Sequence, residues 1–127
     1  MQLSICITSY NRVLELKRCL ESIDSVKYIN DIEIIVSEDR SPRRDEIRHI
    51  VDEYQKTCPY HVIFNSNKIN LGYVGNLGKL IELSNAVYII FMSDDDAFIP
   101  NSLDLTLDVL FVNDYPVAFS PFYLKQT

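Results

Sequence analysis

Lysine and arginine form no run longer than two residues in this sequence, which disfavours general binding to nucleic acid. The 127 residues carry 12 basic and 18 acidic side chains, for a net charge of -6. No apolar stretch approaches the roughly 20 residues that cross a bilayer, and the chain does not open with a basic segment followed by an apolar one. We therefore expect small or neutral partners, no nucleic acid, and neither secretion nor a membrane span.

Cysteine is sparse, since Cys6, Cys19 and Cys58 are odd in number and lack the close spacing of a zinc site. This pattern is typical of reduced thiols in a cytoplasmic protein, each a small residue of the core. Repeats, linkers and low-complexity segments are also absent. Because 47% of the residues are hydrophobic, the chain can bury one core of ordinary size, and we expect one domain over residues 1–127.

Short continuous apolar runs alternate with segments of helical periodicity, a pattern typical of a parallel sheet flanked by helices. The expected fold class is therefore α/β, with a mostly parallel open sheet. Polar loops are expected at 37–42 and 65–75. Strands are predicted at 3–8, 32–36, 61–64, 87–92 and 117–120, and helices after a cap at Asn11, after the loop at 37–42, over 76–83, and after a cap at Asn101 or Ser102.

Three consecutive carboxylates, Asp94, Asp95 and Asp96, follow the apolar run at 86–92. Clustering like charges where a buried strand ends is costly unless a cation supplies the opposite charge. Carboxylate oxygens suit Mg²⁺ or Mn²⁺, which can share them with substrate phosphates. The residues thus indicate a metal site, and the alternative is a solvated acidic turn.

Polar residues follow three of the predicted strands, at 8–12, 38–41 and 93–96. In an open α/β sheet, ligands bind beyond the carboxyl ends of the strands. The three clusters are therefore predicted to share one edge of the sheet. Taken singly, each has a structural explanation as a helix cap, a turn residue or a surface charge.

The polar segments and the strands before them resemble the motifs of the family 2 glycosyltransferases, which have the nucleotide-sugar-binding glycosyltransferase A fold. In two places the sequence departs from the family pattern. Glu38 stands where the first loop aspartate is usual, and Arg40 replaces the customary glycine. This arginine is expected to narrow the nucleotide pocket or to shift the backbone of the loop. The resemblance covers nearly the whole chain and rests on residues 3–12, 34–41, 70–76 and 88–100.

The resemblance implies that the chain is the donor-binding half of such an enzyme. Asp39 would accept a hydrogen bond from the imide N–H of uracil, and the backbone at 8–10 would flank the base and ribose. Mn²⁺ or Mg²⁺ would bridge the two phosphates, and the sequence leaves open which of Asp94, Asp95 and Asp96 holds it. The nucleotide-sugar-binding residues implied in this way are Thr8, Ser9, Tyr10, Arg12, Glu38, Asp39, Gly72, Asn76, Asp94 and Asp95.

By the same resemblance, a sugar would pass from a nucleotide-diphosphate donor, a UDP-sugar by expectation, to a hydroxyl of a glycan, a lipid-linked or another acceptor. A general base is hard to place, because Asp104, Asp108 and Asp114 are expected on or near a solvent-facing helix. We expect the base beyond Thr127, so the fold would be truncated at its C-terminus and transfer by this chain alone would be weak. Such a chain is expected in the cytoplasm or at the inner face of the membrane, with peripheral membrane association through segments outside it.

An incomplete sheet would leave an exposed edge, which predicts self-association into a homo-oligomer. The competing interpretation is a non-catalytic nucleotide- or metal-binding module that pairs with another chain. A phosphotransfer receiver is a weaker alternative, because its acidic residues should follow the first and third strands.

Overall fold

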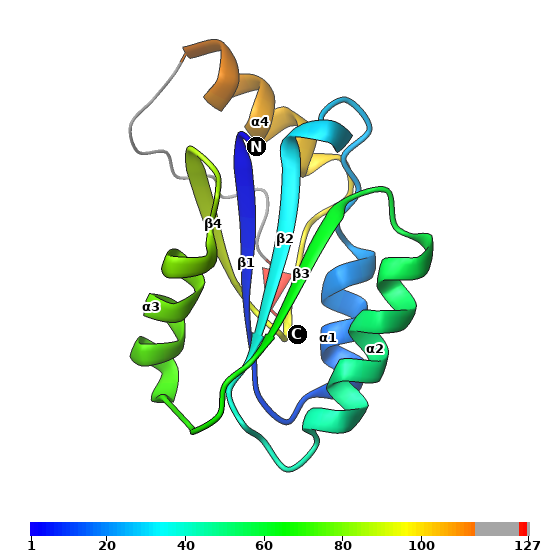
Figure 1. The fold of residues 1–127 in the computed structure, drawn as a ribbon. Helices are drawn as coiled ribbons and strands as arrows, with labels where there is room; N and C mark the ends of the chain where they lie inside the picture. The colour runs from blue at the N-terminus through cyan, green and yellow to red at the C-terminus, as the bar shows by residue number, and fades with distance from the viewer. Residues whose placement is uncertain (114–124, 127) are drawn as a thin grey trace.

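The computed structural model describes residues 1–113 and 125–126 (Figure 1). The strand predicted at 117–120 and the acid Asp114 therefore lie outside the described residues. The elements are β1 (Leu3–Ser9), α1 (Val13–Glu21), the 3-10 helix η1 (Ile29–Asp31), β2 (Ile32–Glu38), α2 (Arg44–Thr57), β3 (His61–Ser66), α3 (Gly72–Leu83), β4 (Tyr88–Ser93), β5 (Asp96–Ala97), α4 (Ser102–Asn113) and β6 (Lys125–Gln126).

The main sheet has four strands in the order β3-β2-β1-β4, all parallel. Helices α1 and α2 cover one face of this sheet and α3 covers the other, while α4 crosses the end where β1 begins (Figure 1). The short strands β5 and β6 pair antiparallel. The predicted α/β class with a parallel sheet is therefore confirmed.

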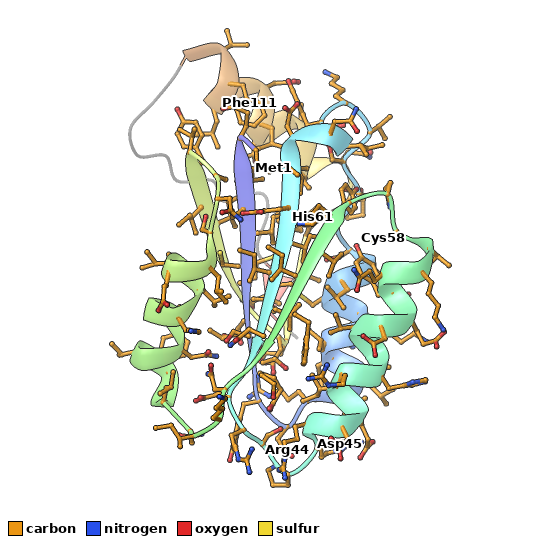
Figure 2. All side chains as sticks on the ribbon, in the orientation of Figure 1. Met1, Arg44, Asp45, Cys58, His61 and Phe111 are labelled. Atoms are coloured by element: carbon orange, nitrogen blue, oxygen red, sulfur yellow. The ribbon has the colours of Figure 1, made fainter. Side chains whose placement is uncertain are left out.

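Burial on both faces explains why apolar side chains of the central strands point to both sides of the sheet. All seven residues of β1 and of β2 are buried. Leu3, Ile5 and Ile7 belong to a large core with α1, α2 and α4, while Cys6 and Ile35 pack with Leu80 of α3. Figure 2 shows side chains filling the space between the sheet and the helices on both of its sides.

Helix α1 begins without the cap predicted at Asn11. Arg12 holds the N-cap position in an extended conformation and makes no side-chain cap hydrogen bond. Asn11 instead has a φ of 60°, in the left-handed region that asparagine tolerates better than most residues. The prediction of the cap was wrong because Asn11 serves the turn between β1 and α1, one residue before the cap.

The carboxyls of Asp104 and Asp108, expected to face solvent, hold the segment after α1 against α4. Asp104 accepts hydrogen bonds from the hydroxyl of Ser25 and from the backbone N–H groups of Val26 and Lys27. Asp108 accepts from Lys27 Nζ at 3.0 Å and from the hydroxyl of Tyr28. The expectation that these two acids face solvent is therefore corrected. Their partners come from the segment after α1, which is separated from them by 77 to 81 positions along the chain.

Two of the three cysteines are core residues, as predicted. Cys6 and Cys19 are buried thiols, and Cys58 is half-buried. Over the described part of the chain, no helix is both long and apolar enough to span a bilayer.

Candidate functional site

A pocket of about 330 Å³ opens at the edge of the sheet where the parallel strands end. Figure 2 places Arg44 and Asp45 at this edge and Met1 and Phe111 at the opposite one. Residues from three strand ends and from the start of α3 meet in the pocket, as the order of the polar clusters predicted. Its walls are formed by Thr8, Ser9, Tyr10, Arg12, Asp39, Asn70, Gly72, Tyr73, Asn76, Ser93 and Asp94.

Asp39, directly after β2, fastens the start of α3 to the sheet. Its carboxylate accepts hydrogen bonds from the backbone N–H of Leu71 at 2.8 Å and of Gly72 at 3.0 Å. Gly72 has a φ of 77°, a conformation that favours glycine. Because a carboxylate satisfies the free N–H groups of the first turn, α3 begins at Gly72 rather than at the predicted Asn76.

Glu38 does not belong to the wall of the pocket. Its side chain is fully buried, and its two oxygens accept the backbone N–H groups of Arg40 at 2.9 Å and Ser41 at 2.8 Å. These bonds hold Arg40 at a φ of 62°. The arginine therefore adopts the left-handed conformation for which glycine is the usual residue, and Glu38, implied as nucleotide-binding, shapes the turn.

A buried network of amides supports Asp39 from below. Asn76 accepts a hydrogen bond from the hydroxyl of Ser37 at 2.7 Å and donates to the Ser37 carbonyl at 2.9 Å. Asn67 donates to both Asn76 and Asp39, at 2.9 and 3.0 Å. The side chains of Asn67 and Asn76 are almost completely buried, so they fix the pocket floor.

Arg12 joins two of the three consecutive carboxylates. One guanidinium nitrogen, Nη1, lies 3.2 Å from Asp94 Oδ1 and 2.9 Å from Asp95 Oδ2. The second oxygen of Asp94 accepts the backbone N–H of Tyr10 at 2.9 Å. Burial raises the pKa of the Asp94 carboxyl, whereas the Tyr10 N–H and the Arg12 charge oppose that shift. The acidic cluster is thus fastened to the turn after β1.

Asp96 has a different hydrogen-bond partner from the other two acids. One of its oxygens accepts the backbone N–H of Ser93 at 3.0 Å, and Oδ1 is buried with no hydrogen-bond partner among the described residues. Burial raises the pKa of this carboxyl, and the neighbouring charge of Asp95 adds to the shift. Asp96 also begins β5, so its role in the structure is partly to shape the chain after β4.

The oxygen donors of the cluster fit a hard divalent cation. Within residues 1–113 and 125–126, no three Asp, Glu, His or Cys side chains are grouped as a complete ligand set. Mg²⁺, however, is commonly held by one or two carboxylates and completes its coordination with phosphate oxygens and water. Asp94 and Asp95 could supply that share once Arg12 releases them, and Asp96 Oδ1 is a further donor without a partner.

Three residues of the pocket wall were not singled out as site residues from the sequence. Asn70 donates from Nδ2 to the Asp39 carbonyl at 2.9 Å, Ser93 ends β4, and Tyr73 follows Gly72 with 67% of its surface exposed. The sequence contains one indication of them, because all three lie in the segments 70–76 and 88–100 that resemble the family motifs. Exposure of a large aromatic ring beside a polar pocket is visible only in the structure.

Two solved structures share the fold of this chain. S. aureus TarS, residues 1-349 in complex with UDP, matches with a TM-score of 0.77 at 19% identity over 90% of this chain and 33% of that chain. The mannosyltransferase PcManGT from Pyrobaculum calidifontis, in complex with GDP-Man and Mn²⁺, matches with a TM-score of 0.74 at 15% identity over 85% and 31% of the two chains. The parallel sheet and its flanking helices thus define a Rossmann-like domain of the glycosyltransferase A fold.

The chain belongs to glycosyl transferase family 2, whose sequence model matches residues 4–126. Among curated proteins, it is 33% identical over 104 residues to the abequosyltransferase RfbV of Salmonella typhimurium. That match covers 81% of this chain and 31% of the relative. The chain therefore spans about a third of the length of the relatives that it matches.

Proposed function

We propose that the pocket binds the nucleotide diphosphate of a sugar donor, UDP in the first place, for transfer of the sugar to an acceptor hydroxyl. The observation that carries this proposal is the meeting of Asp39 and Asp94 in the wall of one pocket. Membership of glycosyl transferase family 2 and the UDP complex of TarS support the same assignment.

The Asp39 carboxylate is suited to bind the nucleobase of the donor. Oδ1 accepts hydrogen bonds from Asn67 and Leu71, and Oδ2 accepts one, from Gly72, among the described residues. A carboxylate oxygen has two acceptor positions, so Oδ2 keeps one for an imide N–H such as that of uracil. The exposed ring of Tyr10, beside Thr8 and Ser9 in the same wall, would flank the base and ribose.

The acidic cluster is suited to the diphosphate end of the donor. Asp94 and Asp95 would hold Mn²⁺ or Mg²⁺, and the Mn²⁺ complex of PcManGT supports a divalent ion in this fold. A bound cation supplies neutralisation of the charge that develops on a departing nucleoside diphosphate. The protein would supply the orientation, because Tyr10 N–H fixes Asp94 through Oδ2.

We propose that the acceptor site and the general base are supplied by the whole protein. Each carboxylate at the pocket is engaged, Asp39 with α3 and Asp94 and Asp95 with Arg12. This observation favours a second candidate, a module that binds the donor without transferring its sugar. Consumption of a UDP-sugar in the presence of acceptor would exclude the second candidate, and stable binding without turnover would support it.

Amide chemical shifts of the isotope-labelled chain during titration with UDP test the proposed pocket. We expect the shifts to concentrate at Tyr10, Asp39 and Gly72, because these residues line or frame it. A groove on the outer surface of α1 and α2, which includes His49 and Thr57, serves as the internal control. Shifts confined to that groove, or no shifts with the diamagnetic ion Mg²⁺ present, would contradict the proposal.

A further inference from the structure

We propose that Arg12 is the resident counter-ion of the acidic cluster and must leave its carboxylates before a divalent cation can bind. One nitrogen of Arg12 contacts both Asp94 and Asp95, at 3.2 and 2.9 Å. The proposal rests on the proposed function for the identity of the final ligand, a nucleoside diphosphate. The competition between Arg12 and the cation follows from the contacts alone.

The two oxygens of Asp94 have different partners. Oδ2 accepts the backbone N–H of Tyr10, which is fixed at the end of β1, whereas Oδ1 faces the side chain of Arg12. A cation approaching Asp94 Oδ1 or Asp95 Oδ2 meets the guanidinium at both oxygens. The position that the cation needs is therefore filled by a side chain rather than by the backbone.

The pair between Arg12 and Asp95 can separate at small cost. The Arg12 side chain is 45% exposed and that of Asp95 30% exposed, so water can solvate both after separation. Ion pairs that are open to solvent contribute little to stability, because hydration compensates for most of their attraction. By contrast, the Tyr10 contact to Asp94 remains in place and keeps the carboxylate oriented.

The charge balance gives the exchange its direction. Once Arg12 has left, three ionised carboxylates carry a charge of about minus three, of which a divalent ion offsets two whereas the guanidinium offset only one. Arg12 also lines the pocket, so the released guanidinium remains close enough to pair with phosphate oxygens, for which its planar fork is suited. Arg12 thus acts as a positioning residue. It first pairs with Asp94 and Asp95 and then, after release, pairs with the phosphate oxygens of the nucleoside diphosphate.

Binding of Mn²⁺ alone, measured by the electron paramagnetic resonance signal of the free ion, tests the exchange without any nucleotide. We expect Arg12→Gln to bind Mn²⁺ about 5- to 30-fold more tightly than the parent chain, since one or two ion pairs no longer have to be broken. Arg12→Lys, which keeps the charge on a flexible stem, should fall between them. Lys56→Gln is the matched control, because Lys56 pairs with Glu53 on α2, outside the pocket.

A thermal-unfolding series gives an independent reading. In EDTA, Arg12→Gln should unfold at a lower temperature than the parent chain because its carboxylates repel one another, and Mn²⁺ should raise its midpoint more than it raises that of the parent. Equal Mn²⁺ affinity in the parent, Arg12→Gln and Lys56→Gln chains, or no Mn²⁺ binding by any of them, would overturn the proposal. Tighter Mn²⁺ binding by Arg12→Gln without UDP binding by the parent would uphold the exchange and reject the nucleotide function.

Discussion

The Asp39 carboxylate accepts a hydrogen bond from the backbone N–H of Gly72 at 3.0 Å, across 33 positions of sequence. The same carboxylate accepts the N–H of Leu71. It therefore caps α3 from the end of a neighbouring strand. One side chain thus determines both where the helix begins and where an acceptor oxygen faces the pocket.

Replacement of Asp39 by asparagine should weaken both the fold and ligand binding. Asparagine keeps one acceptor oxygen but turns an N–H₂ group toward one of the two backbone donors. The free energy of unfolding should fall by about 1–3 kcal/mol, the usual range for an unsatisfied buried group. Urea denaturation measures this loss, with Asp52→Asn, an exposed acid of α2, as the control. An unchanged midpoint in Asp39→Asn would contradict the capping role.

Arg40 allows a test of backbone strain. Because its φ of 62° is costly for a residue with a Cβ atom, Arg40→Gly should stabilise the chain by about 1 kcal/mol. Arg40→Ala removes the same guanidinium but keeps the strained backbone, so it should not be stabilised. Chemical denaturation of the three chains separates the two effects. Equal stability of the glycine and alanine variants would show that the turn carries no strain.

Glu33 lies near the start of β2, at the end of the sheet opposite the pocket. We expect it to make the stability of the fold depend on pH. It is buried and accepts hydrogen bonds from Ser4 and from the backbone N–H of Asn85. Burial by itself would raise its pKa, but these hydrogen bonds outweigh burial and leave the pKa below its ordinary value of 4.5. The stabilisation is therefore present above that value and is lost as the pH falls through the range below it.

Glu33→Gln should lose about 1–3 kcal/mol of unfolding free energy near neutral pH, and the difference from the parent chain should shrink as the parent is protonated in acid. Urea midpoints measured from about pH 7 down to about pH 3 follow this convergence. Glu82→Gln, which removes an exposed ion pair with Lys79, should show a small and nearly constant difference. A difference for Glu33→Gln that does not depend on pH would contradict the assignment.

Local sequence was sufficient to predict the strands of the sheet. It was not sufficient to predict the hydrogen bonds that hold the site residues in place. Runs such as Ile34 to Val36 predicted buried strands because burial on both faces requires continuous apolar residues. The start of α3 was placed too late, since its cap is supplied by Asp39, and no local pattern at residues 70–76 reveals a distant cap. Likewise, the adjacent positions of Glu38 and Asp39 could not show that Glu38 binds the backbone of the turn whereas Asp39 lines the pocket.

The acidic cluster was predicted as a group, and its internal division was not. Sequence treats the three aspartates alike, yet Asp94 and Asp95 share Arg12 while Asp96 bonds to the backbone of Ser93. Between β4 and β5 the chain passes through a turn at residues 94–95. The partner of Asp94 and Asp95 is Arg12, which follows β1. The local sequence around the aspartates does not show that this distant segment lies beside them.

Calorimetric titration of the chain with UDP, with and without Mn²⁺, tests the central claim most directly. We predict binding that Mn²⁺ strengthens and that Asp39→Asn and Asp95→Ala each weaken by about tenfold or more, the equivalent of one lost charged contact. Asp52→Asn should bind as the parent chain does. Absence of UDP binding by the folded parent chain in Mn²⁺, or equal binding by all the variants, would contradict the assignment of this pocket to a nucleotide-sugar donor.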